Sequence, residues 1–290
     1  MEYKTGFTVK PYEVTALGQV IFTDGTNNNI VPNQIQCEAY GYTYDRTSGT
    51  CSAFRYTSSL PINTQNTNNR LNGAGNSTQT GSNTIQMNGT GNTTGGLNNN
   101  CAINGKDNEL ASNIDNATVN GSMGLAIRQG EVVLGGGFYN NVAGIAKVKG
   151  LAQSSKVQLS GKTTDTTATS LNVQDIAGEF IEMQINSILG FEIYITKLQT
   201  GGSAGTAGNF HFIEIKGAAR CDNSGTIILY TYSTTTIASL GLAAVTPAII
   251  VDTSTGGIPS ISVQVTGLVN TDNLWSATAQ LHELRTTITF

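Results

Sequence analysis

The sequence predicts an all-β protein in three parts: a small N-terminal β module, a repetitive shaft of stacked β-coils, and a C-terminal β-sandwich of jelly-roll type. Three observations support this fold class. A motif recurs at a fixed spacing in the middle of the chain, apolar and polar residues alternate along many short segments, and only 12% of the residues are charged. A fixed spacing is typical of folds in which each unit stacks on the next. We place the three parts at residues 1–60, 61–150 and 151–290.

The middle part contains an Asn-Gly pair every 16 residues, at Asn72-Gly73, Asn88-Gly89, Asn104-Gly105 and Asn120-Gly121. Asn-Gly supplies the positive φ of a tight corner, and asparagines at equivalent corners can bond to one another in a ladder. An apolar residue precedes each pair. A second, mostly apolar column lies two positions earlier, on the same strand face. The next repeat is irregular, because Val133 falls in the second column and Gly136-Gly137 replaces Asn-Gly.

One or two apolar residues per coil are too few to form a core within one chain. We therefore expect a homotrimer about a long axis, in which the copies cover one another's apolar columns. The predicted trimer-core residues are Leu71, Ile85, Met87, Cys101, Ile103 and Val119. The alternative is a disordered linker, which a composition rich in Gly, Asn, Thr and Ser would permit. The regular spacing of the apolar residues favours the ordered coil.

Residues 1–60 predict a β module with one strong hairpin signal. A long strand is expected at 34–44, a turn at 45–49 and a returning strand at 51–56. On such a strand Tyr40, Tyr42 and Tyr44 would share one face, for core or subunit packing rather than as a ligand platform. A polar linker is expected at 57–69.

The four cysteines are predicted to be free thiols. The expected hairpin register places Cys51 opposite Thr43 and not opposite Cys37, so these two cysteines lack the geometry of a disulfide. Cys101 lies in an apolar column of the repeat, where cysteine behaves as a small hydrophobe. No Cys/His spacing in the chain indicates zinc.

The C-terminal part consists of strand candidates joined by short polar turns. Phe191, Ile193 and Ile195 would face one way on such a strand, with polar or amphipathic residues between them. About eight strands of this kind predict a β-sandwich of jelly-roll type. The candidates lie at 156–160, 180–188, 191–198, 210–216, 226–234, 248–252, 261–266 and 274–284.

Composition and motifs argue against several functional classes. A net charge of −4 without a dense Lys/Arg cluster argues against nucleic-acid binding. The first residues lack the apolar segment of a signal peptide, and no apolar run is long enough to span a membrane, so we expect synthesis in a cytoplasm. The Gly-rich tracts near residues 135 and 201 lack the features of a phosphate loop, and no cofactor is expected.

The sequence predicts no catalytic residue and no metal ligand. The two histidines, His211 and His282, lie in separate strands and lack ligand spacing. Cleavage of a polysaccharide needs two carboxylates across a cleft, and the Asn-Gly repeat provides none before Asp107. Glu179 and Glu182 stand three positions apart, so on a strand they would point to opposite faces. We therefore expect a protein without enzymatic activity.

The Asn-Gly repeat and the segment at 135–144 resemble the glycine- and asparagine-rich repeats of tailed-phage fibre proteins and of trimeric bacterial adhesin heads. The likeness covers about residues 66–145. In those families such segments form stacked β-coils wound around a three-fold axis. The C-terminal part, with a turn at 222–225 and Trp275 in a late strand, looks like the β-sandwich at the end of many phage fibres and spikes.

This resemblance implies a trimeric structural protein of a virus particle, made in the host cytoplasm. The N-terminal module would attach to other virion proteins, and the C-terminal head would bind a glycan or a protein on the host surface. The sequence identifies no receptor-binding residue. Two alternatives stay open: a tail spike that cleaves polysaccharide, and a capsid decoration protein that binds no receptor.

Overall fold

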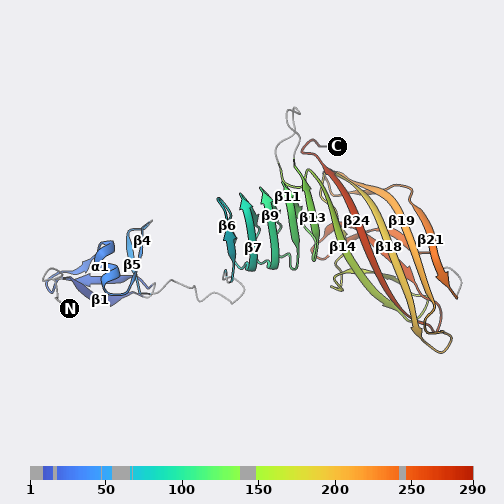
Figure 1. Cartoon of the computed structure of the whole chain (residues 1–290), viewed down its shortest axis with the longest axis horizontal. Helices are drawn as coiled ribbons and strands as arrows, with labels where there is room; N and C mark the ends of the chain where they lie inside the picture. Colours follow the sequence, from blue (N-terminus) through green and yellow to red (C-terminus); the bar gives the residue numbers. More distant parts are fainter. Residues whose placement is uncertain are drawn as a thin grey trace. The chain divides into compact units, whose positions relative to one another are not determined.

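The computed structural model describes residues 9–15, 18–46, 48–53, 66, 68–137, 148–241 and 246–289. The chain divides into two compact units, Met1–Pro61 and Ile62–Phe290. The elements in the described residues are strands apart from one short helix, so the predicted all-β class with stacked coils is confirmed, while the jelly-roll sandwich stays a prediction (Figure 1). Most of the predicted linker at 57–69, and the glycine-rich segment from residue 138 to 144, lie outside the described residues.

The N-terminal unit holds a small sheet, a helix and a hairpin. The sheet is antiparallel and contains β1 (Lys10–Val14), β2 (Val20–Thr23) and β3 (Asn28–Ile30). The helix α1 (Gln34–Ala39) follows, and β4 (Thr43–Asp45) then pairs with β5 (Thr50–Ser52). The buried core of this unit consists of Val20, Phe22, Cys37 and Cys51.

The long strand predicted at 34–44 is wrong, because its first half is α1. The side-chain oxygen of Asn33 accepts a hydrogen bond from the backbone N–H of Gln36, and the side chain of Gln36 accepts one from the N–H of Asn33, both at 2.9 Å. This capping box satisfies two backbone donors at the start of a helix. The tyrosines therefore do not share a strand face. Tyr40 and Tyr42 do serve packing, since both rings lie edge-on to Phe22.

Cys37 and Cys51 form a disulfide, with Cα atoms 5.7 Å apart, so the prediction of free thiols is wrong for this pair. That prediction placed Cys37 on a hairpin strand, whereas it lies in α1. Cys51 also pairs with Tyr44 rather than with Thr43, one residue away from the expected register. Of the other cysteines, Cys101 and Cys221 are free, as predicted, and buried.

Residues 70–136 form a parallel β-solenoid, in which each coil stacks on the next (Figure 1). Leu71 pairs with Met87, Met87 with Ile103, and Ile103 with Val119, so the register follows the predicted 16-residue spacing. Val133 pairs with Val119 and thus belongs to the first apolar column, not the second. One side of the solenoid contains β6 (Arg70–Asn72), β7 (Asn83–Thr90), β9 (Asn99–Lys106), β11 (Thr118–Ser122) and β13 (Val132–Gly136). The other contains β8 (Thr93–Thr94), β10 (Glu109–Leu110) and β12 (Leu125–Ala126).

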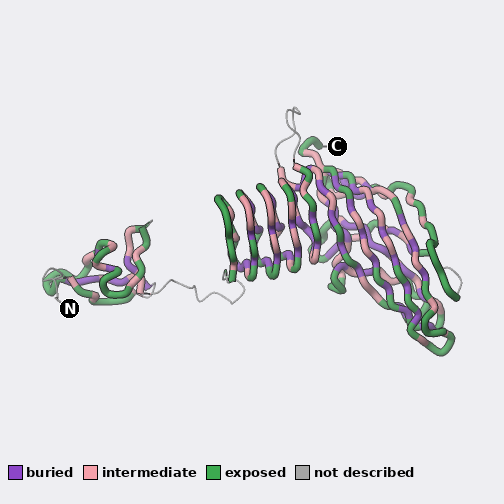
Figure 2. The backbone as a smooth tube through the Cα atoms, viewed as in Figure 1, coloured by how far each residue is buried: buried purple, intermediate pink, exposed green. Residues whose placement is uncertain are grey.

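The apolar columns of the repeat face the interior of a single solenoid (Figure 2). Leu110, Ile114 and Ala126, from the opposite side of the coil, help to complete this core. The premise that one coil cannot bury its own apolar residues is therefore wrong, and burial of these positions needs no second chain. The homotrimer itself stays a prediction. Of the predicted trimer-core residues, Leu71 in the first coil is 40% exposed, and those at most 4% exposed are Ile85, Met87, Cys101, Ile103 and Val119.

Asparagine side chains connect successive coils, as predicted for the corners. In an outer ladder the amide of Asn72 donates to Asn88 at 2.8 Å, Asn88 to Asn104 at 2.9 Å, and Asn104 to Asn120 at 3.1 Å. In an inner ladder Asn92 and Asn108 are fully buried and bond to backbone groups of neighbouring coils. The inner ladder satisfies backbone groups at corners where no strand partner is available, whereas the outer ladder joins side chain to side chain.

The parallel array continues into the C-terminal strands without a break. β13 pairs with β14 (Ala152–Thr163), and the long sheet proceeds through β24 (Asp272–Arg285), β18 (Ser187–Gly201), β19 (Phe210–Cys221) and β20 (Ile227–Leu229). β16 (Asn172–Val173) pairs with β14, and β21 (Ser233–Leu240) with β19. A second sheet contains β15 (Ala168–Ser170), β17 (Ile181–Glu182), β22 (Ala248–Ser254) and β23 (Ile258–Thr266).

The two sheets share one apolar core, to which most of these strands contribute. The strands predicted at 180–188 and 191–198 differ from the structure, because β18 runs through Gly190 as one strand of 15 residues. The segment predicted as one strand at 226–234 divides between β20 and β21. The boundary predicted between shaft and head, near residue 150, coincides with no interruption in the order of the long sheet.

Candidate functional site

A cleft of about 350 Å³ lies between the last coils of the solenoid and the turns of the second sheet. Residues 111–114, Ile127 and Gln129 form its solenoid wall. The opposite wall consists of Glu179, Glu182, Gln184, Thr255 and Ile258. The volume falls within the range of small-molecule sites, and the lining combines amides, hydroxyls and isoleucines with two carboxyl groups.

Glu179 and Glu182 both line this cleft, so the prediction that they point to opposite faces is wrong. Alternation between faces requires a continuous strand, but β17 begins only at Ile181. The preceding segment is a turn, in which Gln174 and Asp175 have positive φ. The two acids were visible in the sequence. The turn before β17 was not, because alternation of polar and apolar residues identifies strands and does not identify turns.

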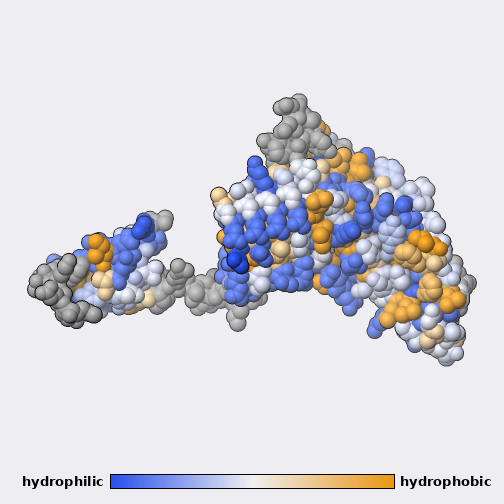
Figure 3. Space-filling model, in the orientation of Figure 1, coloured by the Kyte–Doolittle hydropathy of each residue, from blue (hydrophilic) through white to orange (hydrophobic). Residues whose placement is uncertain are grey.

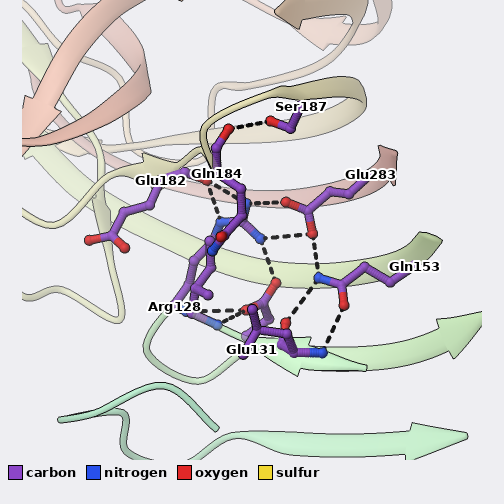
Figure 4. A network of polar contacts seen from close by, with 9 residues as sticks. Arg128, Glu131, Gln153, Glu182, Gln184, Ser187 and Glu283 are labelled. Carbon is purple, nitrogen blue, oxygen red and sulfur yellow. Dashed lines mark hydrogen bonds and ion pairs between the residues drawn. The ribbon is translucent and has the colours of Figure 1, made fainter. Parts of the chain in front are cut away.

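Glu182 has its backbone inside the protein and its side chain at the cleft. The residue is 8% exposed, and its carbonyl oxygen accepts hydrogen bonds from Nε and Nη2 of Arg128. Its carboxyl group points away from that guanidinium (Figure 4). Burial raises the pKa of Glu182 to about 7. Arg128 opposes this rise, while the carboxylates of Glu179 and Glu131 add to it.

Behind the cleft, the guanidinium of Arg128 is buried between two carboxylates (Figure 4). It donates to Glu131 at 2.5 Å and to Glu283 at 2.6 Å. The amide of Gln153 donates to Glu283 at 2.6 Å and exchanges two further bonds with the backbone of Leu125. Burial disfavours a charged guanidinium, but Glu283 and Glu131 more than offset it, so the pKa of Arg128 lies above its ordinary value.

This network fixes the loop that forms part of the solenoid wall. Arg128 and Glu131 lie between β12 and β13, Gln153 lies on β14, and Glu283 lies on β24. Backbone N–H groups of Ile127 and Arg128 also donate to Glu131, at 2.9 and 3.1 Å. Sequence reasoning missed the network. The available signal was an Arg and a Glu on either side of a turn, in a chain with few charges.

The histidines contribute nothing to the cleft: His211 is buried on β19 and His282 is exposed on β24. In the part of the chain that the structure describes, no group of three or more His, Cys, Asp or Glu side chains could hold a metal ion. In the same part, no helix has the length and apolar character needed to cross a membrane.

The outer face of the long sheet, which is the face turned away from the second sheet, carries two apolar bands (Figure 3). A polar belt separates them, in which Lys216 pairs with Glu214 at 3.0 Å and lies 3.9 Å from Glu192. The near band consists of Leu134, Ile188, Ile228 and Leu284, which the strand register places in adjacent rows, with Arg220 between Ile188 and Ile228. The far band consists of Leu198, Phe210, Leu240 and Leu274. Exposed apolar area of this kind on a sheet face is typical of interaction surfaces.

No family model matches the chain, and no curated protein sequence matches it. Two similar solved structures are phage tailspike proteins. The tailspike of Acinetobacter baumannii phage AM24 aligns with a TM-score of 0.28 and 6% identity, over 69% of this chain and 49% of that one. The tailspike of Acinetobacter phage vB_ApiP_P1 aligns with a TM-score of 0.18 and 8% identity, over 74% and 46%. The chain thus spans about half the length of the tailspikes it matches, and a likeness of this degree does not assign it to a family.

Proposed function

We propose that the chain is a structural part of a virus particle, a fibre or spike of a phage tail, that attaches to the host surface. The observation that carries the proposal is the solenoid whose sheet continues unbroken into the C-terminal strands. Each coil bonds to the next through the backbone and through two asparagine ladders. Such a rod holds the C-terminal part at a fixed distance and orientation relative to the first coil of the solenoid, as an attachment fibre needs.

The N-terminal unit would bind other virion proteins. It has its own buried core and a disulfide, so its fold does not depend on contacts with the solenoid. A disulfide persists where the surroundings are oxidising, as they are for a particle released from its host. The chain would be made in the host cytoplasm and function in the virion.

The C-terminal part of a homotrimer would bind the host surface, most simply a glycan. The two apolar bands on the outer face are the surface that neighbouring copies would cover. Three copies on one axis would raise the effective affinity of weak polar contacts. The net charge of −4 favours neither nucleic acid nor an anionic membrane as a partner.

The experiment uses the purified full chain and the bacterium infected by the particles that carry it. Fluorescently labelled chain should bind intact cells and should lose binding when the surface polysaccharide is stripped. Antibodies against the chain should label the tails of intact particles in electron micrographs. Labelling over the whole capsid, without cell binding, would identify a decoration protein instead and would contradict the proposal.

A further inference from the structure

The four Asn-Gly corners of the outer ladder are equivalent in sequence but not in position. The strand β6 ends the long sheet, so the corner at Asn72 and Gly73 lies in a coil with a neighbouring coil on one side only (Figure 1). The other three corners belong to β7, β9 and β11, and each of these strands lies between two others. Asn72 is also exposed, whereas the later asparagines of this ladder, at 88, 104 and 120, are half-buried.

The direction of the backbone N–H groups around Gly89 is fixed by hydrogen bonds to the coil before it. The N–H of Ile85 donates to the side-chain oxygen of Asn69 at 2.9 Å. The N–H of Gly91 donates to the carbonyl oxygen of Ala74 at 3.0 Å. Alternate N–H groups of a parallel strand face the same neighbour, so the N–H of Gly89, which lies between these two, also faces the first coil.

The later corners have the same arrangement, and the first corner lacks it. Two positions after Gly105 and Gly121, the N–H groups of Asp107 and Met123 donate to the preceding coil, at 2.9 and 3.0 Å. Gly73 occupies the equivalent position in the first coil, because the spacing of 16 residues is constant. On the side that its N–H faces, the described residues provide no strand. Gly73 therefore lacks the backbone partner that the other three glycines have.

We propose that Asn72 is a site of spontaneous deamidation, and that the other Asn-Gly pairs react after it, in order from the first coil inward. The backbone nitrogen of Gly73 loses its proton to solvent and bonds to Cγ of Asn72. The side-chain NH₂ group takes up a proton and leaves as ammonia. The resulting five-membered succinimide adds one water molecule, which breaks one of its two ring C–N bonds and leaves an aspartate or an isoaspartate. Glycine favours the ring closure, because it has no Cβ to obstruct it.

The contacts between coils set the order of reaction. The nitrogen of Gly89 cannot attack until its bond to the first coil opens. Deamidation of Asn72 removes the amide that donates to the side-chain oxygen of Asn88 at 2.8 Å, and it leaves a carboxylate facing that oxygen. The two oxygens repel each other, and an isoaspartate also lengthens the backbone by one atom, so the first coil separates from β7. Exposure alone would give another order and place Asn120 second, because Gly121 is exposed whereas Gly89 is half-buried.

The experiment ages the purified full chain in mildly alkaline buffer and follows the four corners by peptide mapping with mass spectrometry. Replacement of the NH₂ group by oxygen raises the mass slightly, and electron-transfer fragmentation separates isoaspartate from aspartate. A parallel sample in urea gives the intrinsic reactivity of each corner, because no coil protects it there. Two variants isolate the first corner: Asn72→Gln keeps an amide but cannot close a five-membered ring, and Asn72→Asp carries the charge from the start. Circular dichroism checks that both are folded.

In the folded wild type we expect Asn72 to react at least about tenfold faster than Asn88, since a hydrogen bond between coils must open first. The four corners should react at similar rates in urea, and Asn88 should react several-fold faster in Asn72→Asp than in Asn72→Gln. Equal rates in the folded chain, Asn120 ahead of Asn88, or an unreacted Asn72 while the urea sample reacts would overturn the inference. The same preference for Asn72 in urea, or equal rates at Asn88 in the two variants, would also overturn it, because the coil contacts would then not set the order.

Discussion

Arg128 donates a hydrogen bond of 2.6 Å to Glu283, a residue 155 positions later in the chain. The first residue belongs to the loop that closes the last coil of the solenoid, and the second to the central strand β24 of the long sheet. With Glu131 and Gln153 they form a buried polar network behind the cleft. An ion pair between Arg128 and Glu283 therefore connects the solenoid to the C-terminal strands, in addition to the continuous sheet.

Arg128→Ala should destabilise the Ile62–Phe290 unit strongly. The substitution leaves Glu131 and Glu283 buried without a cation, a change that typically costs about 3–5 kcal/mol. Urea unfolding followed by circular dichroism measures the free energy. The matched control is Lys216→Ala, which removes a cation from an exposed pair and should leave the midpoint unchanged. Equal effects of the two substitutions would show that the network contributes no more than a surface pair.

Asn108→Ala should weaken the solenoid from within. The Asn108 side chain donates to the carbonyls of Asn104 and Gly121 and accepts from the N–H of Gly124. Each buried group left without a partner costs about 1–3 kcal/mol, so the loss of stability should be several kcal/mol in total. Asn72→Ala, which removes an exposed amide from the first corner of the outer ladder, is the control and should change stability far less. Thermal unfolding of the two variants compares them directly.

Gly105→Ala should prevent the coils from stacking. A Cβ at this position would lie 1.9 Å from the carbonyl oxygen of Gly121 in the next coil, and the φ of +118° is already unfavourable for alanine. The carbonyl oxygen of Gly121 belongs to the backbone, so it cannot move aside as a flexible side chain could. Gly208→Ala has a similar positive φ but meets no atom within 4 Å, so it isolates the cost of the dihedral. We expect soluble, folded Gly208→Ala and misfolded Gly105→Ala; normal thermal unfolding of both would refute the close approach.

The solenoid was predictable because its signal is local and repeated. Successive coils place an Asn-Gly corner and apolar residues at equivalent positions. An irregular residue in one coil therefore does not obscure the pattern, because the neighbouring coils repeat it. The 16-residue spacing could not show which residues cover the apolar columns from the opposite side of each coil. Leu110, Ile114 and Ala126 occupy less regular positions. Without them, each coil appeared to have too few apolar residues to form a core within one chain.

The candidate site was not predictable, because it depends on contacts between distant segments. Glu182 lies on a two-residue strand, and its backbone carbonyl accepts a hydrogen bond from Arg128, which lies 54 residues earlier. The helix α1 was missed for a different reason. Asn33 and Gln36 have the spacing of a capping box, but the alternating tyrosines that follow favoured a strand. That error also concealed the disulfide, because the expected hairpin register placed Cys51 opposite Thr43 and not opposite Cys37.

Leu134→Glu combined with Leu284→Glu should convert the proposed trimer into folded single chains. Both residues lie on the near band of the outer face, where Leu134 is 60% exposed in the isolated chain, so a charge there costs little unless another copy covers it. Light scattering gives the mass, and circular dichroism shows whether the fold persists. Gln158→Glu, in the polar belt of the same face, is the control and should keep the mass of wild type.

Met87→Asp tests the interior instead. It places a charge inside the solenoid, where Met87 is fully buried, so it should unfold the coils rather than release intact single chains. A wild-type mass equal to one chain would contradict the trimer, whatever the variants do.

The stability of the protein should fall as pH rises from about 4.5 to about 7, to an extent set by Glu182. The folded protein keeps the Glu182 proton up to a pKa of about 7, whereas the unfolded chain releases it near the ordinary glutamate value of 4.5. In that interval the folded state binds more protons than the unfolded state, so each rise in pH favours unfolding, by up to about 3 kcal/mol in total. Urea unfolding of wild type and Glu182→Gln across this range isolates the effect, since glutamine cannot titrate. The difference in stability between the two proteins should grow with pH and level off above about 7; a constant difference would place the Glu182 carboxyl group in solvent rather than in the wall of the cleft.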